Sequence, residues 1–129
     1  MRENYFKNEN VEIWIENGIL YVVFAPDLVL TEQIARDLVI ERIRISKGQT
    51  YPMLCVVKDA KTIEKAARDY LSTGDAIRYL SAGAFITNTY IEVLLTNAFL
   101  RLNNPPLKSR LFTDQKEAIR WLEKFKNLN

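Results

Sequence analysis

The chain has 129 residues, a length that fits one domain with a single sizeable core. Hydrophobic residues make up 48% of it and charged residues 26%, and the net charge of +2 is too small to favour binding to nucleic acid. It has no histidine and a single cysteine, Cys55, so it lacks the commonest general base and can form no internal disulfide. We therefore expect a cytoplasmic protein with no metal site and no cofactor.

The N-terminal part of the chain predicts a β-hairpin. Residues 1–10 are polar, and we expect them to be flexible. The segment Val11–Glu16 alternates apolar and acidic residues, which is typical of a half-buried strand. Asn17-Gly18 is a strong signal for a two-residue turn, because both positions must accept a positive φ. The continuously apolar segment Ile19–Phe24 predicts a returning strand that is buried on both faces.

A helix is predicted over Glu32–Ser46, capped at its N-terminus by Thr31 and ended by Gly48. Six apolar residues form one broad stripe along it: Ile34, Ala35, Leu38, Val39, Ile43 and Ile45. Arg42 lies near the middle of this stripe, so its guanidinium needs a buried carboxylate or must extend its head to water. We expect the extended arrangement, and a buried cation that faces a ligand is the alternative.

Strands and helices alternate through the rest of the chain. Residues 53–57 predict a buried strand, and the helix after it carries one apolar face: Ile63, Ala66, Ala67, Tyr70 and Leu71. A break over residues 72–75 and a short helical piece over residues 76–80 lead to a strand at residues 82–87. The segment Ser109–Phe112 predicts the last strand, and Thr113 is expected to cap the final helix.

Residues 89–102 predict a long helix that is apolar on two sides. Val93 and Leu100 lie roughly opposite its main apolar face, and a helix of this kind is usually buried on both sides. We therefore expect a homodimer, and its interface should contain Tyr90, Val93, Thr96 and Leu100. Alternatively, the segment 76–80 packs over this second apolar side of the helix. Charged residues interrupt the helix, so we expect no transmembrane segment.

The order β-β-α-β-α-β-α-β-α predicts an α/β fold. We expect one domain over residues 1–129, with a mixed and mostly parallel sheet of about five strands and about four helices. This order, the hairpin at the start and the chain length resemble the STAS domain, the fold of bacterial anti-sigma-factor antagonists. The segment 103–122, NNPPLKSRLFTDQKEAIRWL, is also similar to small uncharacterised bacterial STAS-like proteins, whose relatives are likened to lipid-binding domains of the CRAL-TRIO type.

The resemblance is clearest where the strand at residues 53–57 leads into a helix. The antagonists have Asp-Ser-Ser-Gly at the start of this helix, and one of the two serines is phosphorylated. On this motif Glu64 takes the Asp position, Lys65 and Ala66 take the two serine positions, and Ala67 takes the glycine position. The family's phosphoserine therefore falls on Ala66, which has no hydroxyl, and we expect no phosphorylation switch.

Four residues are candidates for a ligand or anion site: Lys58, Asp59, Thr62 and Arg42. The first three follow a predicted strand, at the edge of a parallel sheet where α/β proteins bind ligands. Lys58 and the start of the next helix could hold an anion. The simpler interpretation is a turn with a capping hydroxyl and a solvated charge pair, and we favour it.

These features predict binding rather than catalysis, because the chain offers few groups for acid-base chemistry. We expect a bacterial, cytoplasmic, STAS-like regulatory module that acts through protein–protein interaction and self-associates. The alternative is a carrier or sensor of a small apolar ligand or lipid. We expect no enzymatic activity and no nucleic-acid partner, since the basic residues near the C-terminus are predicted to form a solvated surface: Lys108, Arg110, Arg120, Lys124 and Lys126.

Overall fold

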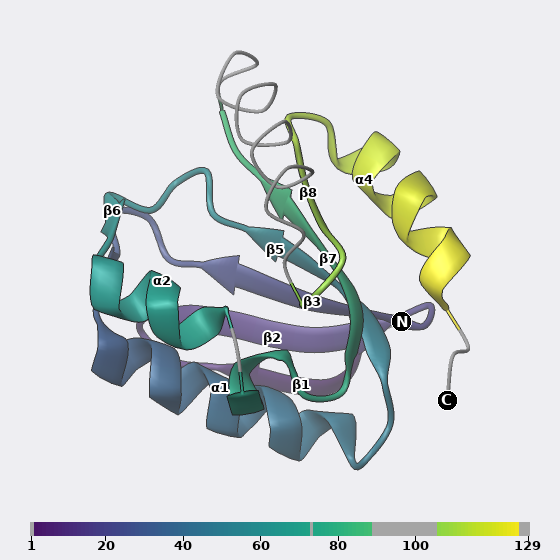
Figure 1. The fold of residues 1–129 in the computed structure, drawn as a ribbon, viewed down its shortest axis with the longest axis horizontal. Helices are drawn as coiled ribbons and strands as arrows, with labels where there is room; N and C mark the ends of the chain where they lie inside the picture. The colour runs from purple at the N-terminus through teal and green to yellow at the C-terminus, as the bar shows by residue number, and fades with distance from the viewer. Residues whose placement is uncertain (1, 73, 89–105, 127–129) are drawn as a thin grey trace.

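The computed structural model describes residues 2–72, 74–88 and 106–126, which form an α/β fold around a mixed six-stranded sheet (Figure 1). Its strands are, in spatial order, β1 (Glu3–Lys7), β2 (Val11–Glu16), β3 (Ile19–Phe24), β5 (Tyr51–Val56), β7 (Leu80–Ile86) and β8 (Ser109–Phe112). β1, β2 and β3 pair antiparallel, and β3, β5, β7 and β8 pair parallel. The predicted fold class is therefore confirmed, with six strands in this sheet where about five were expected.

Helices lie on both faces of the sheet (Figure 1). One face, called the α1 face below, packs against α1 (Glu32–Ser46), α2 (Lys65–Leu71) and the short 3-10 helix η1 (Gly74–Ile77). The other, called the α4 face, packs against α4 (Gln115–Leu122) and the 3-10 helix η2 (Glu123–Phe125). A second, two-stranded parallel sheet joins β4 (Val29–Leu30) to β6 (Thr62–Ile63).

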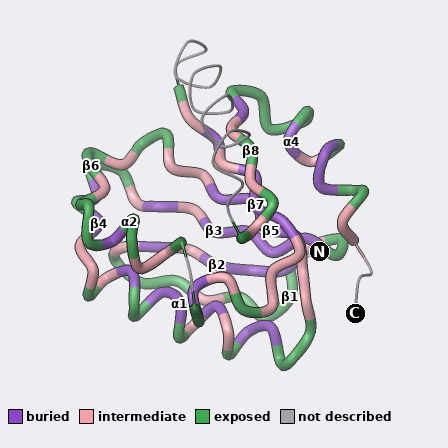
Figure 2. The backbone as a smooth tube through the Cα atoms, viewed as in Figure 1, coloured by how far each residue is buried: buried purple, intermediate pink, exposed green. Residues whose placement is uncertain are grey.

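Successive residues of each strand point to opposite faces, so the sheet supports two separate apolar clusters. Buried positions follow one another along the central strands β3 and β5, as Figure 2 shows. On the α1 face the sheet contributes Ile13, Leu20, Val22, Met53 and Cys55. On the α4 face it contributes Trp14, Tyr21, Leu54, Ala84 and Phe112. The predicted burial of β3 on both faces is confirmed.

The hairpin turn and α1 follow the sequence closely. Asn17 and Gly18 both have a positive φ, 52° and 76°, as a two-residue turn of this type requires. The Thr31 hydroxyl accepts a hydrogen bond from the Ile34 amide at 3.2 Å and caps α1. Lys47 and Gly48 end the helix in the left-handed conformation, with φ of 50° and 78°.

Several other boundaries differ from the prediction, including that of the second helix: Ile63, predicted on its apolar face, lies in β6, and α2 begins at Lys65. Residues 3–7 form the edge strand β1, and the expectation of a flexible N-terminal segment is wrong for them, because they pair antiparallel with β2. β7 begins at Leu80, so the helical piece predicted over residues 76–80 is the shorter η1, which ends at Ile77. Asp114 rather than Thr113 caps α4, since its carboxylate accepts from the Lys116 amide. The long helix predicted over residues 89–102 lies outside the described residues.

Candidate ligand-binding site

Backbone hydrogen bonds fix the turn that carries Lys58, Asp59 and Thr62. The Asp59 carbonyl accepts from the Asp27 amide at 2.8 Å, and the Lys58 carbonyl accepts from the Asn88 side chain at 2.8 Å. Thr62 begins β6 and pairs with β4. All three of these residues are exposed. This geometry favours the simpler interpretation of the segment as a turn, since its main chain is held by neighbours and its side chains point away from the core.

The position that resembles the phosphorylated serine lies at the start of α2, as the resemblance implied. Glu64 precedes the helix, and its side chain forms no capping hydrogen bond. Ala66 is exposed on the first turn, whereas Ala67 is fully buried against α1 and the sheet. A hydroxyl at position 66 would thus be accessible to a kinase, and alanine supplies none.

Arg42 is buried, with only 1% of its surface exposed, so the expectation that its head extends to water is wrong. Its Nη2 donates to the backbone carbonyls of Asp75 and Ala76 at 3.2 and 3.1 Å, which ties α1 to η1. Burial lowers the pKa of the guanidinium to about 10, so it remains cationic at neutral pH. In the part of the chain that the structure describes, it forms no ion pair with a carboxylate.

A cavity of about 360 Å³ opens beside Arg42, between the α1 face of the sheet and the helices α1, α2 and η1. We call it the Arg42 cavity. Its described walls are mainly apolar, with side chains such as Leu38, Met53, Phe85 and Leu111 contributed by α1, β5, β7 and β8. A volume of this size lies at the lower end of the range of roughly 300 to 1,000 Å³ that small-molecule sites occupy.

Most polar side chains in the cavity wall already have a partner in the protein. Ser72 donates to the Arg68 carbonyl at 2.7 Å, and Ser109 donates to the Leu107 carbonyl at 2.9 Å. Arg68 is exposed and donates to the Ile63 carbonyl at 3.0 Å. The exception is Nη1 of Arg42, which is buried and has no hydrogen-bond partner among the described residues. The wall is therefore mainly apolar, and one of its residues, Arg42, has a buried cationic nitrogen with no hydrogen-bond partner among the described residues.

The other reactive group in the wall is Cys55, which is buried in β5. Burial raises the pKa of its thiol to about 12, so the thiolate that would act as a nucleophile is scarce at neutral pH. The described residues contain no group of three or more acidic, cysteine or histidine side chains that could hold a metal ion. None of the described helices is long and apolar enough to span a membrane.

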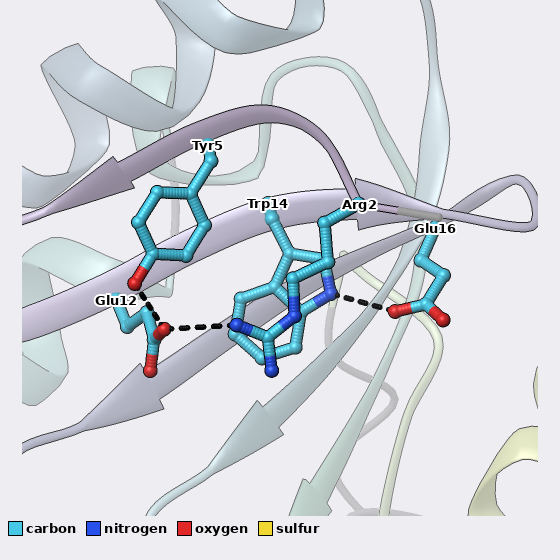
Figure 3. Close-up of polar contacts among 5 residues, drawn as sticks. All are labelled: Arg2, Tyr5, Glu12, Trp14 and Glu16. Carbon is cyan, nitrogen blue, oxygen red and sulfur yellow. Dashed lines mark hydrogen bonds and ion pairs between the residues drawn. The ribbon is translucent and has the colours of Figure 1, made fainter.

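A polar and aromatic cluster lies on the α4 face of β1 and β2, as Figure 3 shows. The guanidinium of Arg2 lies 4.1 Å from the ring centroid of Trp14 and 3.1 Å from the Glu12 carboxylate. The Tyr5 hydroxyl also donates to Glu12, and the Trp14 indole donates to Glu16 at 3.1 Å. Sequence reasoning missed this cluster, although the alternation in Val11–Glu16 places Glu12, Trp14 and Glu16 on one face.

A solved structure of similar fold exists. It is the crystal structure of an uncharacterised protein of the DUF3478 family with a SpoIIAA-like fold, from Shewanella loihica PV-4. The two chains superpose with a TM-score of 0.62 over 91% of this chain and 98% of the other, at 17% sequence identity. The chain thus has a SpoIIAA-like fold. No curated protein matches its sequence.

The sequence profile of one family, described as a domain of unknown function (DUF7793), matches residues 13–126. The chain belongs to this family. The match begins within β2 and runs through α4 and η2, so it includes every described element that lines the Arg42 cavity.

Proposed function

We propose that the protein is a non-enzymatic, STAS-like binding module that holds a small, largely apolar ligand in the Arg42 cavity, as a carrier or sensor. The observation that carries this proposal is the cavity itself, whose volume of about 360 Å³ and mainly apolar wall match those of small-molecule sites. Among the described residues this wall presents mainly apolar side chains to the cavity, and a ligand that covers apolar surface gains about 25 cal/mol per Å² removed from water.

The wall of the cavity supports binding rather than catalysis. Its ionisable side chains among the described residues are Arg42, Arg68 and Cys55. Two of these are guanidinium groups, a side chain that proteins do not use to exchange protons, and the third is a thiol whose pKa burial raises to about 12. General acid-base chemistry needs a group that exchanges a proton near neutral pH, and none of these three does so.

A neutral fluorescent probe, N-phenylnaphthylamine, tests the proposal. We expect its emission to rise on binding to the wild-type protein. Ser109→Leu adds apolar volume to the cavity wall and should weaken probe binding about tenfold or more, which corresponds to roughly 1.4 kcal/mol. The matched control is Arg110→Leu, which changes the next residue of β8 on the opposite face of the sheet. Equal loss in both variants, or no binding by the wild type, would contradict the proposal.

Self-association is the second candidate function, and it depends on the two-sided apolar pattern of residues 89–102. Its predicted interface residues lie outside the described residues: Tyr90, Val93, Thr96 and Leu100. We expect the double variant Val93→Glu, Leu100→Glu to convert a dimer to a monomer in sedimentation velocity experiments, because the interface would bury unpaired charges. Ile40→Glu is the matched control, since Ile40 is 63% exposed on α1. A wild-type protein that sediments as a monomer at micromolar concentration would rule out this second function.

A further inference from the structure

Arg42 carries a positive charge for which the described structure offers no anionic partner. Two backbone carbonyls accept hydrogen bonds from Nη2, but among the described residues Nη1 has no hydrogen-bond partner and no carboxylate pairs with the group. A buried and unpaired charge costs several kcal/mol of desolvation energy, and charges retained in protein interiors are usually paired. An apolar side chain of similar length would pack against the same wall without this cost. An anion bound next to Arg42 would offset this desolvation cost.

The contacts of Arg42 separate a structural role from a binding role. Of the two terminal nitrogens, Nη2 donates the hydrogen bonds that join α1 to η1, through the carbonyls of Asp75 and Ala76. Nη1 does not contribute to that connection, yet it belongs to a side chain that lines the cavity. A ligand acceptor at Nη1 would satisfy the remaining donor and neutralise the charge at the same time.

We propose that the ligand of the Arg42 cavity is an amphipathic acid, an aliphatic carboxylic acid whose carboxylate binds Nη1 of Arg42 and whose chain lies along the apolar wall. This inference rests on the proposed function, because it names the class of ligand for the same cavity. The apolar wall contributes most of the contact area, and the ion pair fixes the orientation of the ligand.

The site matches a carboxylate better than a phosphate. Arg42 is the buried guanidinium of this wall, and its one unpartnered nitrogen can form a charge-assisted hydrogen bond to a monoanion, whereas the second guanidinium, Arg68, is exposed and donates to the Ile63 carbonyl. A phosphate monoester carries a charge of about −1.5 to −2 and three acceptor oxygens, whereas Nη1 of Arg42 is the one buried donor that the described residues leave without a partner. Ser72 and Ser109 already donate to backbone carbonyls. Because Nη1 is buried, a ligand can reach it only if the atoms that cover it move.

Competition with the bound neutral dye at about pH 7 tests the inference on the intact protein, using octanoate and the matched neutral alcohol octanol. We expect octanoate to bind the wild-type protein about 10- to 100-fold more tightly than octanol, the usual contribution of a hydrogen bond to a charged group. In Arg42→Met this preference should disappear while octanol binding persists. In Arg68→Met, which removes the exposed arginine of the same wall, the preference should persist.

Each other outcome is informative. Equal affinity for octanoate and octanol in the wild type would overturn the carboxylate assignment and leave the apolar cavity as the proposed function. Tighter binding of octyl phosphate than of octanoate would overturn the assignment in favour of a phosphate head. Failure of both octanoate and octanol to displace the dye would overturn this inference and the proposed function together. If circular dichroism shows that Arg42→Met is not folded, Arg42→Lys replaces it. A preference for octanoate over octanol that is unchanged in Arg68→Met and reduced in Arg42→Lys supports the assignment. A preference that is lost in Arg68→Met and unchanged in Arg42→Lys overturns it.

Discussion

Replacing Arg42 with alanine is expected to lower the free energy of unfolding by about 3 to 5 kcal/mol. The change removes most of the side chain of a residue that is only 1% exposed, and it leaves a void between α1 and η1. It also removes the donor to the Ala76 carbonyl, and an unsatisfied buried carbonyl costs about 1 to 3 kcal/mol. The Asp75 carbonyl suffers less, because the Arg78 amide also donates to it at 3.2 Å. Urea denaturation followed by circular dichroism measures the loss.

Arg42→Met, measured in the same way, separates the contribution of side-chain volume to the free energy of unfolding from that of the charge. Methionine fills most of the space and removes the desolvation cost of the cation, although it donates no hydrogen bond to the Ala76 carbonyl. We expect this variant to lose only about 1 kcal/mol. An equally large loss in Arg42→Met and Arg42→Ala would show that the hydrogen bonds of the guanidinium, rather than its packing, hold η1 against α1.

Arg42 also shows what a sequence pattern can and cannot predict about a site. The 3.6-residue spacing of α1 placed the guanidinium correctly inside an apolar stripe. Its partners are backbone carbonyls 33 and 34 residues later in the chain, in a 3-10 helix whose position depends on the packing of α2 and the start of β7. Backbone acceptors have no residue-type signature, so the sequence offered only a carboxylate or water as partners.

Local signals explain why the hairpin and α1 were predicted with correct bounds. A turn at Asn17-Gly18 depends on two residues that accept a positive φ, and the start of α1 depends on a hydroxyl that reaches the Ile34 amide. β1 has no comparable signal, because four of its five residues are exposed and the partly buried one is Phe6. β4 and β6 have two residues each, which is too short for any alternation to appear.

The strand order of the parallel part of the sheet could be predicted from the sequence, but the cavity beside it could not. Strands β3, β5, β7 and β8 lie side by side in chain order and pair parallel, as the strand–helix alternation predicted. The cavity between this part of the sheet and α1, α2 and η1 could not be predicted, since its volume depends on how side chains from distant segments pack. The candidate residues at the end of β5, by contrast, came from a general rule about sheet edges, and the structure places them outside the cavity wall.

The second large effect is expected at Trp14, where replacement by alanine should lower the free energy of unfolding by about 3 to 5 kcal/mol. Its indole is 7% exposed and stacks on Tyr21 with ring centroids 4.9 Å apart and planes 2° apart. The Arg2 guanidinium lies over the same ring (Figure 3). Trp14, which lies on β2, thereby contacts Tyr5 of β1, with ring centroids 6.5 Å apart, and Tyr21 of β3, so its loss removes contacts to both neighbouring strands.

Two control variants divide this effect into its parts. Trp14→Phe keeps an aromatic ring against Tyr21 and loses the hydrogen bond to Glu16, so we expect a loss of about 1 to 2 kcal/mol. Arg2→Ala removes the cation from the indole and should cost at most about 1 kcal/mol, because Arg2 is exposed. Guanidinium chloride denaturation of the three variants gives the order. If Arg2→Ala lowers the free energy of unfolding as much as Trp14→Ala does, Arg2 rather than the indole holds β1 on the sheet. Truncating the indole would then lower the stability no further than losing its contact with the Arg2 cation does.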